Sequence, residues 1–334
     1  MKYDSILFGN GLTIAILKKI GDSVKLSERE RRCCYLNNFM YELLSAPIFS
    51  PEYRRFLKFL NPNYIKLAEQ HKEVKNALNP YIDDILNLGF ERWAGKYVLD
   101  EINGVLKKYF DYLYVIYNYW YRELENNVLQ KTDVKLIIEQ IITQLESQGD
   151  TFFTTNFDLL IDNPHVSNPL TVEHIHGRFV SPYTKYDQVL AFYIDPKTFL
   201  YTYLYGTTGY EKMSSLGNIH QQQYPSYDLG FFYDHYSCLG NLLIYGISFS
   251  FSNIVDDTFY SEYSEHDKDY MLRSVDGHII YRLKILVDKG LVNSITIAVY
   301  DWEQEITRYQ SLFSDPVFDH KIKFLKSTEA LSLS

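Results

Sequence analysis

The chain of 334 residues lacks most of the features that mark disulfide-rich, metal-binding or membrane proteins. It has only three cysteines, Cys33, Cys34 and Cys238, which are too few for a disulfide framework. The adjacent pair Cys33-Cys34 also lacks the Cys-x-x-Cys spacing of a zinc ribbon, so we expect no metal site. A reducing, cytoplasmic compartment suits this composition. No apolar run reaches about 18 residues and no charged-then-apolar leader is present, so we expect neither a membrane span nor a signal peptide.

The chain also has no excess of positive charge. Its 33 lysines and arginines stand against 42 aspartates and glutamates, which gives a formal net charge of −9 at pH 7. A negative surface disfavours non-specific binding to nucleic acid or anionic lipid, so we predict neither as a partner. Hydrophobic residues make up 46% of the sequence, which is ample for a packed core and indicates a globular protein.

Strand patterns alternate with helical patterns at both ends of the chain. Helices are expected at 132–148, 196–205, 253–262 and 276–289, and strands at 4–8, 151–155, 170–175, 188–193, 242–245, 294–299 and 321–325. This alternation is typical of the α/β class, with a doubly wound, Rossmann-like parallel sheet. Residues 25–148 have an almost entirely helical pattern, which begins with a capping box at Ser27 and Glu30. We therefore predict an α/β domain made of residues 1–24 and 149–334, and a large all-helical insertion at 25–148 after the first βα unit.

Polar side chains follow two of the expected strands at the point where each strand ends. The strand at 151–155 ends at Thr155 and runs into Asn156 and Asp158, and the strand at 170–175 runs into His176 and Gly177. Open α/β sheets bind their ligands at the carboxyl ends of the strands. Taken singly, each residue has an ordinary structural explanation, such as an Asx-turn or a hydrogen-bonded core histidine. His174 shares a strand face with His176, and we expect it to pack behind the site.

A glycine-containing turn follows the first strand. Its sequence is Gly9-Asn10-Gly11-Leu12-Thr13, and the apolar run that comes next opens a helix. A strand, a glycine turn and a helix start can bind a pyrophosphate through backbone N–H groups and the helix dipole. The third glycine of the dinucleotide fingerprint is absent, and Thr13 stands where a hydroxyl could donate to phosphate. The turn by itself is therefore a weak signal.

Together these motifs resemble a known family. Gly-x-Gly-x-Thr, Thr-Thr-Asn-Phe-Asp, His-Gly and a later Gly246-Ile247-Ser248 occur in the order found in sirtuin-like NAD-binding domains. The resemblance is closest to the bacterial sirtuin-like proteins of the anti-phage, abortive-infection type. The protein-deacetylating branch fits less well, because its Pro-Asp-Phe-Arg run and its zinc ribbon are both missing. Water is therefore a simpler acceptor than an acyl-lysine.

The resemblance implies a role for each matched residue. NAD⁺ would be the substrate, and no metal would be needed. His176 would be the general base, Asn156 would hold the water or the ribose hydroxyls, and Asp158 would orient that group of residues or bind the ribose. The remaining matched residues would contact the nucleotide. Gly9, Asn10, Gly11 and Thr13 would lie near the pyrophosphate, Gly246 and Ser248 near a phosphate or the adenosine ribose, and Thr155 would be a further binding residue. Asp301, which follows the last strong strand, would lie on the adenine side or, at least as well, be a plain cap at the end of that strand.

The sequence thus leads to the hypothesis of an NAD⁺ glycohydrolase that depletes NAD in phage defence. Three alternatives stay open: a non-catalytic NAD or ADP-ribose sensor, an ADP-ribosyltransferase, and a scaffold that only binds a partner. The helical insertion contains an aromatic segment at 109–121 that exceeds what one helix buries against a single face. We expect the insertion to regulate activity by covering the cleft or by contacting a second copy or a defence-system partner protein. The alternative is that these helices only complete a monomeric core. The Gly-, Ser- and Tyr-rich residues 206–230 have no clear period, and their role stays open.

Overall fold

The computed structural model describes residues 2–35, 124–156, 158, 160–162, 166–175, 189–195, 198–203, 238–249, 273–274 and 276–331, with the single residues 73, 76 and 80. The chain divides into two compact units. The first consists of Met1–Ile16, Leu136–Phe179 and His220–Ser334, and the second of Leu17–Lys135 and Val180–Ile219. Each unit is described by itself below.

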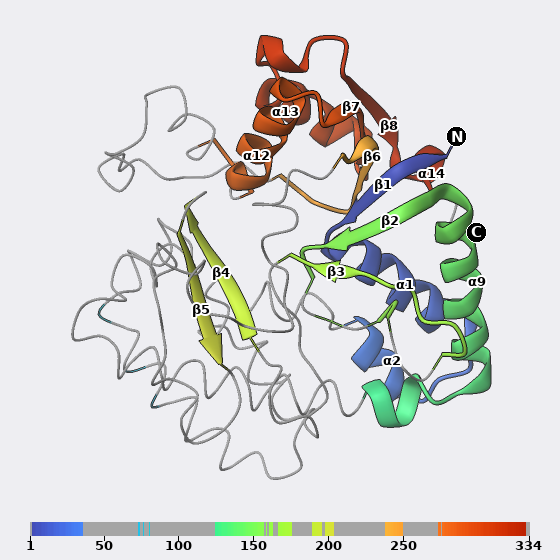
Figure 1. The fold of residues 1–334 in the computed structure, drawn as a ribbon. Coiled ribbons are helices and arrows are strands. Elements are labelled where there is room, and N and C mark those ends of the chain that lie inside the picture. The colour runs from blue at the N-terminus through green and yellow to red at the C-terminus, as the bar shows by residue number, and fades with distance from the viewer. Residues whose placement is uncertain are drawn as a thin grey trace. The chain divides into compact units, whose positions relative to one another are not determined.

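The first unit is built on a six-stranded sheet in which all neighbouring strands are parallel. The strand order is β3-β2-β1-β6-β7-β8 (Figure 1). The strands are β1 (Tyr3–Phe8), β2 (Gly149–Thr154), β3 (Glu173–His174), β6 (Gly240–Tyr245), β7 (Val292–Val299) and β8 (Ile322–Lys326). The chain runs outward from β1 to β3 and then returns to the other side of β1 with β6. This order is that of Rossmann-like dinucleotide-binding sheets, and its direction reverses between β1 and β6.

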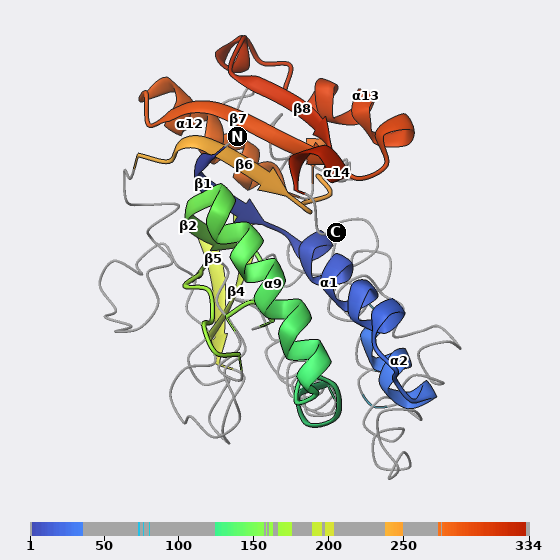
Figure 2. The ribbon, with the colours of Figure 1, turned by 90° about the vertical axis from the view of Figure 1, so that its right-hand side faces the viewer.

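Helices cover this sheet on both faces, because parallel strands need crossover connections of one hand. Figure 1 shows α12 (Gly277–Asp288) and α13 (Trp302–Leu312) on the opposite side of the sheet from α9 (Thr132–Gln148), and Figure 2 shows the same elements from the side. The start of α1 (Asn10–Ser23) follows β1 directly, and two short helices, η6 (Pro316–Phe318) and α14 (Ser327–Ala330), flank β8. On α9 the buried residues recur every three or four positions: Val134, Ile138, Ile141, Ile142 and Leu145.

The central strands are buried on both faces, which explains their nearly continuous apolar sequence. All residues from Ser5 to Phe8 in β1 and from Leu242 to Tyr245 in β6 are buried. The predicted α/β class with a parallel, Rossmann-like sheet is therefore confirmed. The strands expected at 4–8, 151–155, 242–245, 294–299 and 321–325 and the helices expected at 132–148 and 276–289 are confirmed as well. Of the strand expected at 170–175, only Glu173–His174 pairs with β2.

The second unit contains α2 (Glu28–Tyr35), the short π-helix η3 (Leu124–Val128) and an antiparallel pair of strands, β4 (Val189–Asp195) and β5 (Thr198–Tyr203). The predicted capping box is present, because Glu30 N–H donates to Ser27 Oγ at 3.3 Å and Ser27 N–H donates to Glu30 Oε2 at 2.7 Å. The helix expected at 196–205 is wrong. Its Thr, Phe, Leu and Tyr residues favour a strand, and pairing with β4 decides the conformation.

Several expectations fall outside the described residues. They are the helix at 253–262, the aromatic segment at 109–121, the loop at 206–230, and most of the helical insertion at 25–148. The regulatory role expected for the insertion therefore stays a prediction.

Glycines bring the end of β1 against the end of β6, where the strand order reverses. Gly9 N–H donates to Tyr245 O and Gly11 N–H donates to Gly246 O, both at 2.8 Å. Gly246 has φ 76°, and a Cβ built on it would lie 2.7 Å from the backbone nitrogen of Leu12. A Cβ on Gly11 would lie 2.6 Å from Gly246 Cα. Only glycine allows two backbones to approach this closely.

This contact predicts a difference between two alanine substitutions. Gly246→Ala and Gly290→Ala each place an L residue at a left-handed φ, which costs about 1–2 kcal/mol. A Cβ on Gly290 meets nothing within 4 Å, whereas one on Gly246 meets backbone. We expect Gly246→Ala to lower the free energy of unfolding clearly more than the control Gly290→Ala in denaturant titrations. Equal losses would contradict the proposed backbone contact.

Candidate functional site

Polar side chains from three successive parts of the first unit converge at the carboxyl ends of β1, β2 and β3. Thr13 lies in the first turn of α1 and is buried. Asn156, Asp158 and Asp162 follow β2, and His174 ends β3 and is buried as well. Because parallel strands end at the same edge of a sheet, residues up to 147 positions apart in the sequence become hydrogen-bonded neighbours here.

The direction of the hydrogen bonds in this network follows from one carbonyl group. Asn156 Nδ2 lies 3.2 Å from Gly9 O, and a carbonyl oxygen only accepts, so the amide nitrogen of Asn156 must face it. The same Nδ2 donates to Thr13 Oγ1 at 2.9 Å. The Thr13 hydroxyl therefore donates its own hydrogen to Asp158 Oδ2 at 2.8 Å. Both amide hydrogens of Asn156 are used, which leaves its side-chain oxygen, an acceptor, as its remaining polar group.

Asp158 accepts two hydrogen bonds but stands in a poorly solvated place. Besides the Thr13 hydroxyl, the Leu160 N–H donates to its Oδ1 at 3.1 Å. Burial raises the pKa of the Asp158 carboxyl above its usual range, and this effect outweighs the two donors, which favour the ionised form. The charge of His174 also lowers this pKa, whereas that of Asp162 raises it. A carboxyl with a raised pKa at a strand end is a common feature of functional sites.

His174 joins the third strand to this network through both ring nitrogens. Its Nδ1 lies 2.7 Å from the main-chain oxygen of Asn156, and its Nε2 lies 3.0 Å from Asp162 Oδ2. The expectation that His174 packs behind the site agrees with this position. Asp162 was not among the predicted residues. In the sequence, Asp162 is only an acidic residue four positions after Asp158. That spacing alone does not identify it as the partner of a histidine.

The predicted nucleotide residues at the end of β1 are largely engaged with other parts of the chain. The N–H groups of Gly9 and Gly11 donate to β6 and its following residue, as described above. Thr155 connects β2 to β1, since its N–H and its hydroxyl both point to Phe8 O, at 3.0 and 3.4 Å. Asn10 is the first residue of α1, whose first turn contains no acidic residue. The dipole of α1 therefore favours an anion at this end.

The residues after β6 are held in place by α13. Arg308 Nη2 donates to Ser248 O at 2.8 Å, and the Tyr309 hydroxyl donates to Ile247 O at 2.8 Å. Phe249 has φ 44° and is fully buried, and its ring packs edge-on against Tyr309. Ser248 itself is exposed. These anchors of Gly246-Ile247-Ser248 come from a helix about 60 residues further along the chain, so sequence patterns gave no sign of them.

Asp301 is the N-cap of α13, directly after the strand end where a plain cap was one of its two predicted roles. It precedes α13, and its Oδ1 accepts from Gln304 N–H at 3.3 Å. His176 and Gly177 lie outside the described residues, so their roles stay predictions.

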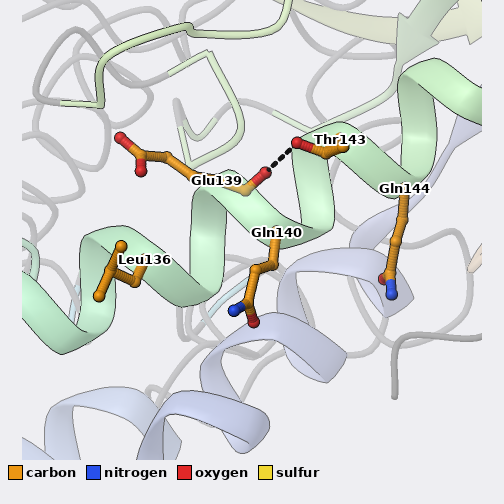
Figure 3. A pocket seen from close by; sticks show the side chains of 5 residues that line it. All are labelled: Leu136, Glu139, Gln140, Thr143 and Gln144. Atoms are coloured by element: carbon orange, nitrogen blue, oxygen red, sulfur yellow. Dashed lines mark hydrogen bonds between the residues drawn. The ribbon is translucent and has the colours of Figure 1, made fainter.

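A shallow groove lies on α9 (Figure 3). Its lining residues all belong to this helix and are Leu136, Glu139, Gln140, Thr143 and Gln144. The lining contains one carboxylate and no basic side chain, which is unsuited to a pyrophosphate.

In the part of the chain that the structure describes, no three His, Cys, Asp or Glu side chains gather into a metal-binding cluster. Within the same part, no helix has the length and apolar character needed to cross a membrane.

Comparison with known proteins found no matching family model, no matching curated protein and no matching solved structure.

The raised pKa of Asp158 predicts a pH dependence of stability. Because the folded-state pKa lies above the unfolded one, the contribution of Asp158 to stability is present at acidic pH and is lost as the pH rises through the folded-state pKa. Asp158→Asn removes this titration and keeps the acceptor for Thr13. We expect the free energy of unfolding of the wild type, minus that of Asp158→Asn, to fall between acidic and neutral pH. Asp150→Asn, which removes an exposed carboxylate, is the control. A difference that rises with pH would contradict the assignment.

Proposed function

We propose that this protein is an NAD⁺ glycohydrolase that releases nicotinamide and ADP-ribose, and that it acts as an NAD-depleting effector in phage defence. The observation that carries the proposal is the joining of Thr13, Asn156 and Asp158 into one hydrogen-bonded group beside the point where the strand order reverses. Open α/β sheets bind nucleotides at this point. The ordered resemblance to sirtuin-like NAD-binding domains supports NAD⁺ as the nucleotide.

The proposed reaction is a hydrolysis that needs neither a metal nor an external oxidant. The bond between C1′ of the ribose and the nicotinamide nitrogen breaks, and its electron pair leaves with nicotinamide as a neutral ring. The oxygen of water forms a new bond to C1′, and the water proton passes to a base. Since the leaving group needs no proton, the protein must position water and stabilise the positive charge that develops on the ribose.

The geometry of Asn156 gives it a definite part in this reaction. Its two amide hydrogens are held by Gly9 and Thr13, so its side-chain oxygen is the group it can offer to a ligand. In the proposal this oxygen accepts from the attacking water or from a ribose hydroxyl. His176 takes the proton, as the resemblance implies. Asp158, when ionised, places a negative charge in a poorly solvated site, where it stabilises a developing cation more strongly than in water.

Turnover by the purified chain tests the proposal, and His176→Ala tests its mechanism. Wild-type protein incubated with NAD⁺ should release nicotinamide and ADP-ribose in equal amounts. We expect His176→Ala to lose about 10²–10⁴-fold in kcat, because a general base contributes about that much, while NAD⁺ still binds. Binding measured by calorimetry separates the two effects. Binding without release by the wild type would indicate a sensor, and label transferred to a macromolecule would indicate an ADP-ribosyltransferase.

A second prediction concerns Asn156. Asn156→Ala removes a positioning acceptor without a titratable group, so we expect kcat to fall by about 10²-fold while the acidic limb of the pH–rate profile stays in place. Asn241→Ala is a matched control, because Asn241 accepts from Ser294 at the start of β6, at the opposite edge of the same sheet. Loss of the acidic limb in Asn156→Ala would mean that proton transfer has been assigned to the wrong residue.

A further inference from the structure

We infer that His174 and Asp162 form a positioning pair that holds the main chain of Asn156 through a proton on His174 Nδ1. Both side chains are shielded from solvent, with exposed fractions of 3% for His174 and 9% for Asp162. Nδ1 lies 2.7 Å from Asn156 O, and Nε2 lies 3.0 Å from Asp162 Oδ2. The kinetic part of this inference rests on the proposed function, whereas the assignment of the proton does not.

The location of the proton follows from the partners of the ring. The main-chain oxygen of Asn156 has no hydrogen to give, so Nδ1 must carry a proton and donate it. A second proton must lie between Nε2 and Asp162 Oδ2, because two lone pairs repel each other at 3.0 Å. The pair therefore holds two protons. One is on Nδ1 and is donated to Asn156 O, and the other lies between Nε2 and Asp162 Oδ2. Asp162 thereby orients the ring and fixes which nitrogen faces Asn156.

The pair completes a set of contacts that hold Asn156 from four sides. The N–H of Asn156 donates to Thr154 Oγ1 at 3.0 Å, and its side chain contacts Thr13 and Gly9. His174 supplies the hydrogen bond to its carbonyl and is the contact that comes from β3. Without this bond, the peptide after Asn156 loses its fixed orientation. That peptide leads toward Asp158, so both side chains proposed to face the ribose depend on it.

Two substitutions of His174 separate a positioning role from a general structural one. The amide nitrogen of an asparagine side chain lies near the place of Nδ1, so His174→Asn can keep the donor to Asn156 O. A glutamine amide nitrogen lies near the place of Nε2, so His174→Gln keeps a donor to Asp162 but not the one to Asn156. The two amides are equally polar and neutral, and both variants lose the imidazole.

We expect His174→Gln to lower kcat by about 10²-fold, because misplacing a site residue by about 1 Å costs that much, with little change in KM. His174→Asn should recover most of that loss, to within several-fold of the wild type. Melting temperatures of both variants should be alike. Equal kcat losses in the two variants would overturn the positioning role, as would losses that follow the melting temperature.

The proton on Nδ1 can be tested whether or not the chain hydrolyses NAD⁺. The chain has nine histidines, so the signals of His174 must be assigned first. In nitrogen NMR spectra of protein labelled with ¹⁵N-histidine, they are the signals present in the wild type and missing from His174→Asn. At neutral pH we expect the chemical shift of a protonated nitrogen for Nδ1, and Asp162→Asn should move the Nε2 signal. A bare Nδ1 would overturn the inference. A protonated Nδ1 in a protein that releases no nicotinamide would refute the proposed function and leave the pair assigned.

Discussion

The carbonyl group of Gly9 sets the direction of the whole polar network at the end of the sheet. Since this oxygen can only accept, it fixes the amide of Asn156, which in turn makes Thr13 an acceptor toward Asn156 and a donor toward Asp158. Gly9 itself is fixed because its N–H donates to Tyr245 O at the end of β6. The orientation of the candidate catalytic amide therefore depends on the parallel pairing of β1 with β2 and β6.

The glycines after β1 hold the fold together with the same N–H groups that a bound phosphate would need. Gly9 and Gly11 use their N–H groups to hold β1 against the end of β6, and Gly246 provides the space for that contact. A nucleotide at this edge would be attracted by the dipole of α1, and the acidic group next to the first turn of this helix is the Asp158 carboxyl, which accepts from Thr13. It would also find the residues after Gly246 already ordered, because Arg308 and Tyr309 hold their carbonyl groups. Such order lowers the entropic cost of binding.

The groups around Asp158 have opposing effects on the pKa of its carboxyl. Burial and Asp162 raise the pKa of Asp158, whereas Thr13, the Leu160 N–H and His174 lower it. Asp162 in turn lies against His174. Its negative charge is therefore paired with the proton between the two side chains and does not face Asp158 alone. Asp158 is half-buried, and a carboxyl whose charge is balanced this closely can respond to a cation that forms nearby, which is what cleavage of a ribosyl bond would present.

Much of the fold was determined by the sequence alone. Strands β1, β6 and β7 are buried on both faces, so each must be an apolar run, and α9 must repeat its apolar residues every three or four positions. The polar residues at the end of β2 and the glycines after β1 could also be predicted, because each interrupts an apolar run directly after a strand. Only the tertiary structure decided that 198–203 is a strand and that Asp162 is the partner of His174. These outcomes depend on which segments the fold brings into contact, and a local pattern of three or four residues does not identify a pairing partner that lies outside it.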